Sequence, residues 1–440
     1  MLKIAKFGGS SVASSEQFKK IKNIVDTDDT RKFIVTSACG KASSDDHKVT
    51  DLLYLLHAHV KYGVDYKPIF NLIKDKYVKI KNELNIDYDI EKEFDEIEKN
   101  INKNMNVDYL VSRGEYLTGR LLSKYLDMEF LDSEDFVTFN YDLTFDMEET
   151  KKKFLSKVDF SKKYVIPGFY GVTPNGDIKV MERGGSDITG AIVANIADCD
   201  LYENWTDVSG IMVTDPRIVN NPKIIDYMSF EELREISYMG ANVLNDESIF
   251  PCQEKGIPIN IRNTNDYKAP GTMIVSDINN EDIKTKTLPI TCITGKRDYT
   301  IVNVKKNHIA GDTRVLKSAL KILESLNVSI EMMPSSIDSF SLVCETKKVE
   351  KDLYKILSKL EEVFPNATIN VEKGVMLICI VGRGMAGRIG FAGSLFSTLG
   401  ENNINVKIIN QGSDELNITI GIEEKNYEKA VNAIYNKFIK

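Results

Sequence analysis

The chain has 440 residues, 42% of them hydrophobic and 28% charged, and its 57 lysines and arginines against 65 aspartates and glutamates give a net charge of −8. This length allows about two or three domains, and the composition is that of a water-soluble globular protein. The acidic balance argues against a nucleic-acid-binding surface, and the sequence has neither an apolar leader segment nor a run of roughly 18 apolar residues that would span a membrane. Six scattered cysteines without a Cys-x-x-Cys pair favour reduced thiols in a cytoplasmic protein and argue against a structural zinc site.

The first dozen residues predict an anion-binding turn. A short buried strand ending at Phe7 is followed by Gly8 and Gly9, and the amphipathic run Ser15–Ile24 then predicts a helix. Such a break directs backbone N–H groups at one spot, which suits phosphate because glycine has no Cβ to hold it away. Lys6 lies where its charge can reach a transferring phosphoryl group. The alternative is a tight turn with a surface lysine, since short glycine-rich motifs are weak signals by themselves.

A second buried strand is predicted over Lys32–Thr36, and it runs into the polar loop Ser37–Ser44. The strand–helix–strand order implies a parallel sheet whose ligand site lies at the carboxyl ends of the strands. Both candidate loops fall at such ends. From Val49 to Met105 the pattern is mostly helical and charged, which indicates a helical excursion outside the sheet.

The stretch Ser112–Tyr116 opens a predicted helix that ends at Leu126. Its simplest interpretation is a charged first helical turn, where the helix dipole favours glutamate. Strands are predicted over Tyr164–Ile166 and Gly168–Tyr170, and Thr173–Asp177 has the composition of a hairpin turn.

A second glycine-rich helix opening lies at Glu182–Gly190. Two such loops in one α/β domain, both with basic and hydroxyl side chains, could hold a polyanion from two sides. The predicted strand Leu201–Trp205 ends in the acidic segment Thr206–Ile211, which could bind a ribose, and Arg217 could reach a phosphate. The alternative for the segment around Asp215 is a polar β-turn. Further predicted elements are helices over Ser229–Met239 and Asp246–Lys255 and a strand over Ile257–Ile261.

Two segments after about residue 280 resemble each other at an offset of about 76 residues. Each predicts the order β-α-β-β-α, a ferredoxin-like pattern repeated in tandem. Such a pair behind a catalytic domain suggests ligand sensing, although a fold alone does not prove a function. The predicted elements are Tyr299–Val304, Asp312–Leu326, Asn327–Ile330, Asp338–Val343 and Val349–Val363 in the first repeat, and Val375–Ile380, Ile389–Gly400, Asn403–Val406, Asp414–Thr419 and Asn426–Phe438 in the second.

Together these stretches resemble the aspartate kinases, a branch of the amino acid kinase family, over nearly the whole chain. The motifs that carry the resemblance are Lys6–Val12, Thr36–Ala38, Ser112–Glu115, Glu182–Asp187, Trp205–Val208 with Gly210–Ile211, and Thr214–Arg217. The opening motif alone would not separate aspartate kinases from glutamate, acetylglutamate, carbamate or uridylate kinases. The repeats resemble paired ACT domains, and Asn410–Ser413 is similar to a ligand loop of such domains. The resemblance implies an open, mainly parallel α/β sheet sandwiched by helices in residues 1–280, followed by two α+β ferredoxin-like ACT modules in residues 281–372 and 373–440.

The resemblance further implies ATP-dependent phosphorylation of the β-carboxylate of L-aspartate to 4-phospho-L-aspartate, the first step of the pathway to lysine, threonine and methionine. Lys6 would stabilise the transferring phosphoryl group, and Asp187 would orient Lys6. The implied substrate-binding residues are Thr36, Ser37, Glu115, Arg183 and Ser186, with Glu115 on the α-ammonium and Arg183 on a carboxylate. The implied nucleotide-binding residues are Lys6, Gly8, Gly9, Ser10, Trp205, Thr206, Asp207 and Arg217. Mg²⁺ would be bound mainly through ATP and water, because the sequence shows no dedicated carboxylate cage.

One stretch departs from the family pattern. Asn242 stands where the family has a lysine that approaches ATP, Asn245 and Asp246 replace a His-Pro pair, and Met212 replaces a frequent tyrosine. A neutral amide cannot supply the missing charge. We therefore expect ATP binding weakened by roughly 1–3 kcal/mol for one lost phosphate contact, or compensation by a neighbour such as Lys255.

Two alternatives stay open beside an active, feedback-regulated aspartate kinase. The chain could be another carboxylate kinase of the family, or a catalytically weak amino-acid sensor. Effectors of such repeats usually bind at a subunit interface, so we expect a homodimer or larger assembly, lysine, threonine or both as effectors, and no fused homoserine dehydrogenase. The candidate effector contacts are Asp312, Thr313, Val328, Ser329, Ser336 and Asp338 in the first repeat, and Asn403, Ile404, Asn405 and Gln411 in the second.

Overall fold

The computed structural model divides the chain into two units, which are described separately. It describes every residue except Arg183, 241–243, 245, 277–287, 308 and 310–312. The first unit comprises Met1–Ile211, Ile224–Leu233 and Asn242–Lys286, and the second comprises Met212–Lys223, Arg234–Ala241 and Thr287–Lys440. The second unit thus takes two segments from within the first 280 residues. The domain limits expected at 280/281 and 372/373 stay a prediction.

The first unit is built on an eight-stranded sheet with the strand order β3-β4-β2-β1-β7-β9-β10-β8. Neighbouring strands run parallel except for the antiparallel pair of β9 and β10, so the predicted open, mainly parallel sheet is confirmed. The strands are β1 Lys3–Phe7, β2 Arg31–Thr36, β3 Glu129–Phe130, β4 Tyr164–Pro167, β7 Leu201–Thr206, β8 Tyr227–Ser229, β9 Ile259–Asn263 and β10 Thr272–Val275. A separate hairpin joins β5 Tyr170–Val172 to β6 Ile178–Val180 around the predicted turn.

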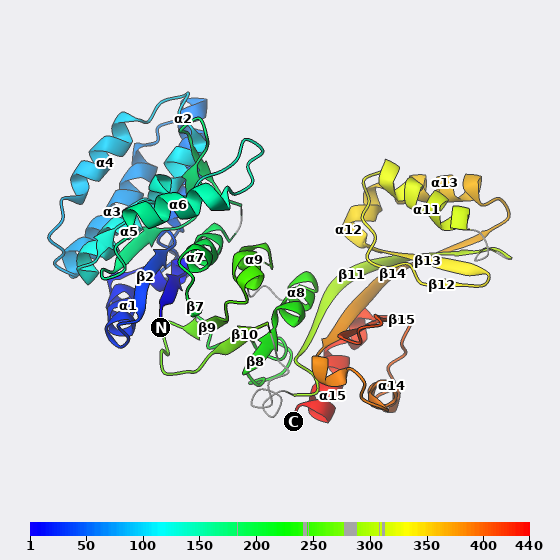
Figure 1. Cartoon of the computed structure of the whole chain (residues 1–440). Helices are drawn as coiled ribbons and strands as arrows, with labels where there is room; N and C mark the ends of the chain where they lie inside the picture. Colours follow the sequence, from blue (N-terminus) through cyan, green and yellow to red (C-terminus); the bar gives the residue numbers. More distant parts are fainter. Residues whose placement is uncertain (183, 241–243, 245, 277–287, 308, 310–312) are drawn as a thin grey trace. The chain divides into compact units, whose positions relative to one another are not determined.

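Helices cover both faces of this sheet (Figure 1). The helices of the first unit are α1 Ser15–Asp26, α2 Val49–Tyr62, α3 Lys67–Glu83, α4 Ile90–Lys99, α5 Val107–Leu126, α6 Met147–Lys157, α7 Gly185–Ile196 and α9 Asp246–Lys255. Helix α8 Phe230–Tyr238 is divided between the two units. Successive side chains of a strand point to opposite faces. Ala5 and Phe7 join a core formed with α1 to α5, whereas Lys6 points to the face on which α7 packs. Helices α2, α3 and α4 are the predicted helical excursion and pack against α5.

Helix α5 begins earlier than the sequence suggested. Asn106 caps it by accepting a hydrogen bond from the N–H of Asp108 (2.8 Å), so the helix starts at Val107. The stretch Ser112–Tyr116 therefore lies in the second and third turns, where Ser112 to Glu115 are buried, and the interpretation as a charged first turn was wrong. An N-cap side chain that accepts from the first turn is the usual start of a helix, and Asn106 supplies it.

The second unit contains a six-stranded antiparallel sheet with the order β12-β13-β11-β14-β16-β15. The long strands β11 and β14 pair at its centre, so each repeat contributes one half of the sheet in mirrored order. The strands are β11 Cys292–Lys305, β12 Ser335–Ser336, β13 Ser339–Glu345, β14 Thr368–Val381, β15 Ile408–Gln411 and β16 Asn417–Glu423. The helices are α11 Thr313–Ser325, α12 Thr346–Val349, α13 Leu353–Val363, α14 Phe391–Glu401 and α15 Tyr427–Phe438. This arrangement confirms the tandem α+β modules.

One strand of each repeat was misplaced in the sequence analysis. Neither Asn327–Ile330 nor Asn403–Val406 is a strand, and the short strands β12 and β15 begin further along the chain. The first asparagine of each segment has a positive φ of 54°, which turns the chain sharply after the preceding helix. Asn327 and Asn403 are equivalent positions, so the same turn recurs in both repeats.

Short 3-10 helices complete the fold at Gly9–Val12, Ser133–Asp135, Glu350–Asp352, Arg383–Met385 and Glu424–Asn426. Within the described parts of the chain, every helix is too short or too polar to cross a lipid bilayer.

Candidate active site

The carboxyl ends of the central strands bring three predicted loops to one edge of the sheet. Phe7 at the end of β1 lies opposite Thr36 of β2 and Trp205 of β7. The N–H of Ser37 donates to the carbonyl of Phe7 (3.1 Å), and the N–H of Gly168 donates to the carbonyl of Thr36 (2.9 Å). The loops that follow β1, β2 and β4 are thus hydrogen-bonded neighbours, as the parallel sheet predicted.

The turn after β1 is held from behind by the loop after β2. The N–H of Gly40 donates to the carbonyl of Gly9 (2.9 Å), and a Cβ on Gly40 would lie 2.6 Å from the Gly9 carbonyl. Gly40 is therefore the glycine that this close approach requires. Gly8 has an extended backbone, and a Cβ built on it would lie 3.5 Å from Lys6 Nζ. Its lack of a side chain leaves space above the lysine, and Ser10 follows in the same half-exposed turn.

Lys6 forms a buried ion pair with Asp187 in the first turn of α7. Its Nζ lies 2.6 Å from Asp187 Oδ1, and the lysine side chain is 8% exposed. The same carboxylate oxygen accepts from Asn204 Nδ2 (2.6 Å), and the hydroxyl of Tyr202 donates to the backbone carbonyl of Asp187 (3.2 Å). Two neighbouring strands and one helix therefore fix the lysine ammonium group at this edge of the sheet.

The start of α7 is pressed against the loop after β4. A Cβ on Gly185 would lie 2.5 Å from the Phe169 ring, and one on Gly168 would lie 2.8 Å from the Cα of Ser186. Phe169 has a φ of +80°, a backbone conformation that is unfavourable for an aromatic residue. Such strained backbone conformations cluster at functional sites. Ser186 is buried at this contact, and Arg183, the predicted carboxylate ligand, lies outside the described residues.

Two buried side-chain oxygen atoms beside these loops have no hydrogen-bond partner within the described part of the chain. They are the hydroxyl of Thr36 and the Oε2 atom of Glu115. Burial raises the pKa of the Glu115 carboxyl to about 8, although a hydrogen bond from the Ala38 backbone and the charge of Arg113 lower it. Buried polar atoms without partners are costly, so this pair is suited to receive polar groups of a ligand. Ser37 follows Thr36 directly and is half-exposed at the same edge of the sheet.

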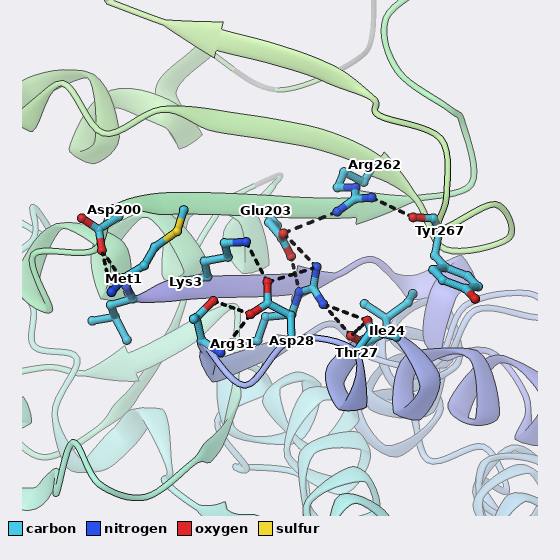
Figure 2. A network of polar contacts seen from close by, with 12 residues as sticks. Met1, Lys3, Ile24, Thr27, Asp28, Arg31, Asp200, Glu203, Arg262 and Tyr267 are labelled. Atoms are coloured by element: carbon cyan, nitrogen blue, oxygen red, sulfur yellow. Dashed lines mark hydrogen bonds and ion pairs between the residues drawn. The ribbon is translucent and has the colours of Figure 1, made fainter.

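Trp205 is placed differently from the other predicted nucleotide residues. Its ring is buried on the face opposite Lys6, stacked on Phe7 at 5.9 Å, and its Nε1–H donates to Glu203 (3.0 Å). Figure 2 shows Glu203 between Arg31 and Arg262 in this network. The indole therefore points away from the Lys6 edge. Only the backbone of Trp205 reaches that edge, where its carbonyl accepts from the N–H of Gly8 (3.1 Å).

The remaining predicted nucleotide residues are divided between the two units. Thr206 and Asp207 follow β7, with Asp207 exposed and its carboxylate accepting from the Thr206 hydroxyl (3.2 Å). Arg217 belongs to the second unit, where it is exposed and pairs with Asp215 at 2.6 Å. The structure thus groups Thr206 and Asp207 with Lys6 in the first unit.

Lys255 is bound at the C-terminal end of α7. Its ammonium binds the carbonyl of Asn195 (2.6 Å) and the carboxylate of Asp198, both at the C-terminal end of α7. Asp187 lies in the first turn of that helix, about 12 Å away along its axis at 1.5 Å per residue. Compensation by Lys255 stays a prediction, and it would require this lysine to leave these two partners. Asn242 and Asn245 lie outside the described residues.

The candidate effector residues occupy equivalent places in the two repeats. Val328 and Ile404 are buried, Ser329 and Asn405 are exposed directly after them, and Asn403 makes the turn before Ile404. Ser336 in β12 and Gln411 in β15 lie at opposite edges of the six-stranded sheet. Asp338 lies between β12 and β13, Thr313 begins α11, and Asp312 is outside the described residues.

Several contributing residues escaped the sequence analysis. Asn204 lies between Glu203 and Trp205 in β7, so no alternation of polar and apolar residues marks it as facing the site. Gly40 was noted only as part of a polar loop, and its contact with Gly9 depends on the register of β1 and β2. No pattern in the sequence indicates the φ of Phe169.

Comparisons with known proteins agree with this geometry. A model described as the amino acid kinase family matches residues 1–263, and an ACT domain model matches residues 378–438. Aspartokinase 3 of Bacillus subtilis is 32% identical over 453 residues, which cover 99% of this chain and 98% of the relative. The crystal structure of Clostridium acetobutylicum aspartate kinase, described as an allosteric enzyme, has 45% identity and a TM-score of 0.91, with 99% of each chain covered. E. coli aspartokinase III in complex with lysine and aspartate shares the fold, with a TM-score of 0.78 and 22% identity over 100% of each chain.

Proposed function

Because the chain belongs to the amino acid kinase family, within its aspartate kinases, we propose that it transfers the γ-phosphoryl group of ATP to the β-carboxylate of L-aspartate. An oxygen of the carboxylate attacks the γ-phosphorus, the bond to the β–γ bridging oxygen breaks, and ADP and 4-phospho-L-aspartate are formed. The observation that carries the proposal is the Lys6–Asp187 pair at the strand ends, beside the unpartnered atoms of Thr36 and Glu115.

The proposed chemistry needs positioning and charge rather than a general base. A carboxylate with a pKa near ~4 is already ionised at neutral pH. The protein must bring two anions into line and stabilise the charge on the moving phosphoryl group. Lys6 is suited to the second task because Asp187 and Asn204 hold its ammonium group in place. The turn Gly8–Ser10 would bind the phosphates through its backbone.

The proposed substrate contacts follow from the partners that the buried side chains lack. Glu115 would bind the α-ammonium of aspartate, and the hydroxyls of Thr36, Ser37 and Ser186 would line the pocket. Arg183 would bind a carboxylate of the substrate. Thr206 and Asp207 would contact the nucleotide through side chains and Trp205 through its backbone, while a role for Arg217 rests on the resemblance alone.

A magnesium ion fits this site as part of the Mg²⁺–ATP complex. Among the described residues no group of three histidine, cysteine, aspartate or glutamate side chains could hold a metal ion. Mg²⁺ often keeps several waters and binds substrate phosphates with one or two protein carboxylates at most. We therefore propose that ATP itself carries the ion, which supplies positive charge to the phosphate oxygens.

Substrate choice tests this proposal. ADP release with ATP and Mg²⁺ is expected with L-aspartate and absent with L-glutamate. Release with glutamate or another carboxylate, but not with aspartate, would favour the alternative of a different carboxylate kinase. No release with any of these substrates, together with tight binding of lysine, would favour a catalytically weak sensor.

Glu115 predicts a pH dependence of aspartate use. Its carboxyl must be ionised to bind an ammonium group, and its pKa of about 8 keeps it mostly protonated at lower pH in the ligand-free protein. The kcat/KM for aspartate should therefore rise by about tenfold per unit between pH 6 and 7.5 and level off above pH 8. Stability has the opposite slope, because a raised carboxyl pKa makes the folded state lose stability as the pH rises from about 4.5 to 8.

The matched variant is Glu115→Gln, which cannot ionise. It should have a low kcat/KM for aspartate that does not change between pH 6 and 8. Its free energy of unfolding should fall less steeply with pH than that of the wild-type protein, because the contribution of Glu115 is absent. A wild-type profile without a rise in kcat/KM below pH 8 would show that Glu115 does not bind the ammonium group.

We also propose feedback inhibition by lysine, threonine or both, bound between two chains. The C. acetobutylicum relative is described as allosteric, and E. coli aspartokinase III binds lysine in its crystal structure. Ser336 and Gln411 lie at opposite edges of one sheet, so a site that contains both requires a second chain. This supports a homodimer or larger assembly. All six cysteines are buried and none forms a disulfide, which fits the cytoplasm that we propose as its compartment.

The equivalent positions Ser329 and Asn405 offer a matched pair for testing this regulation. Either lysine or threonine is expected to suppress ADP release. If the second repeat binds the inhibitor, Asn405→Ala should raise the inhibitory concentration of that amino acid by about tenfold, and Ser329→Ala should leave it unchanged. If the first repeat binds it, Ser329→Ala should raise this concentration and Asn405→Ala should leave it unchanged. Equal inhibition of both variants and the wild-type protein would exclude these positions as effector contacts, and no inhibition by either amino acid would contradict the regulatory proposal.

A further inference from the structure

The loop between β2 and α2, residues 37–48, touches two parts of the candidate site. The Ala38 backbone hydrogen-bonds to the Glu115 carboxylate. The N–H of Gly40 donates to the carbonyl of Gly9 in the turn after β1, 2.9 Å away. The position of this loop therefore affects both Glu115 in the proposed aspartate pocket and Gly9 in the turn that would bind the phosphates.

Lys76 on α3 binds this loop from behind. Its side chain is only 12% exposed. Its ammonium group lies 2.5 Å from the Gly40 carbonyl, 2.7 Å from Asp46 Oδ2 and 3.1 Å from the His47 carbonyl. An ammonium group has three N–H donors, so these three acceptors satisfy it completely.

Asp46 extends this contact through the loop. Its carboxylate also accepts from the N–H groups of Ala42 and His47, each at 2.7 Å. The lysine charge thus stabilises a carboxylate that itself orders the loop backbone, and hydrogen bonds to charged groups are the stronger kind.

Helix α3 is a firm support for this contact. Its residues Ile73, Tyr77 and Ile80 are buried in the large core of the first unit. The hydroxyl of Tyr77, the residue after Lys76, donates to the carbonyl of Gly114 (2.7 Å), directly before Glu115. Two consecutive residues of α3 therefore hold the loop on one side of Glu115 and the α5 backbone on the other.

We propose that Lys76 is a positioning residue for the phosphoryl transfer, an inference that rests on the proposed function. It touches neither the proposed substrate contacts nor Lys6. By binding Gly40, Asp46 and His47 it keeps the Ala38 backbone on Glu115 and the Gly40 N–H on Gly9. Without the Lys76 ammonium group, the loop loses the three hydrogen bonds that Gly40, Asp46 and His47 accept. The residues of the proposed aspartate pocket that depend on this loop are then no longer held in place.

The test compares Lys76→Met with Lys79→Met, an exposed lysine on the same helix. Lys76→Met is expected to raise the KM for aspartate by about tenfold, since small misplacements of binding groups have effects of this size. Lys76→Met should stay folded, with a thermal midpoint below that of Lys79→Met because a mostly buried ion pair is lost. The KM of Lys79→Met should equal the wild-type value. Asp46→Asn should raise the KM by about threefold, and Lys76→Met with Asp46→Asn should be no worse than Lys76→Met alone because the two groups act as one unit.

A second readout does not depend on activity. Amide hydrogen exchange of Ala42 and His47 should be faster in Lys76→Met than in the wild-type protein, with exchange in α7 unchanged. A wild-type KM or unchanged loop exchange in Lys76→Met would overturn the inference, and so would equal loss of protection throughout the first unit. If Lys76→Met fails to fold, Asp46→Asn with an unchanged KM would overturn it as well. A wild-type protein that does not use aspartate would instead overturn the proposed function.

Discussion

Replacing Lys6 with alanine is expected to lower kcat by ~10²–10³-fold or more while the fold stays intact. The ammonium group is the positive charge that the structure fixes at the strand ends, 2.6 Å from Asp187. Its removal leaves the transferring phosphoryl group without that charge, and an effect present mainly in the transition state lowers kcat more than it raises the KM for either substrate. Steady-state ADP release, with both KM values measured, checks this.

Lys3→Ala is the matched control for Lys6→Ala. Lys3 lies on the same strand and pairs with Asp28 at 2.7 Å, but at the opposite end of β1. Its removal should leave kcat near the wild-type value. Wild-type turnover in Lys6→Ala, or equal losses in both variants, would contradict the role proposed for Lys6.

Replacing Glu203 with alanine is expected to destabilise the first unit by roughly 3–5 kcal/mol, because it leaves buried cations without their partner. The Glu203 side chain is 1% exposed and accepts from Arg31 at 2.7 and 3.1 Å. Arg262 lies 3.6 Å from it (Figure 2). The Trp205 Nε1–H also donates to it. Removal of Glu203 takes the closest carboxylate from two guanidinium groups and the acceptor from one buried indole N–H. Arg31 then keeps the Ile24 carbonyl and Asp28, and Arg262 keeps the Tyr267 carbonyl.

Urea unfolding followed by the fluorescence of Trp205, the single tryptophan, measures this loss in the first unit. Asp29→Ala is the control, since Asp29 pairs with Lys163 on the surface and exposed pairs contribute little. The control should unfold at the wild-type urea concentration. A Glu203→Ala midpoint equal to that of the control would show that the buried network is not needed for stability.

The sequence predicted the parts of this fold that depend on local pattern. Glycine-rich stretches indicated the turn after β1 and the start of α7, and the parallel order followed from strand–helix–strand connections. The offset of about 76 residues predicted two equivalent modules, which the mirrored halves of one sheet bear out.

Features that depend on register and on distant contacts were not predictable in the same way. Trp205 was expected to contact the nucleotide, but its pairing with Phe7 turns the indole to the opposite face of the sheet from Lys6. The segment 212–223 lies in the second unit because the N–H of Ile293 donates to the Val213 carbonyl (2.7 Å) and the N–H of Lys223 donates to the Tyr435 hydroxyl (2.9 Å). No local periodicity encodes such pairings.

The site itself was predicted mainly through the family resemblance. Lys6 and Asp187 are far apart in sequence, and only the fold brings them to 2.6 Å. The support from Asn204 and Lys76 was missed because isolated polar residues in a strand or on a charged helix have no distinctive pattern.

The most direct test of the proposed reaction is to trap its product with hydroxylamine, which converts an acyl phosphate into a hydroxamate. With ATP, Mg²⁺ and L-aspartate, the wild-type protein should form aspartyl hydroxamate in equal amount to ADP, and Lys6→Ala should form almost none. ADP release from the wild-type protein without hydroxamate would show that the phosphoryl group goes to water or to another acceptor, and it would contradict phosphorylation of the β-carboxylate.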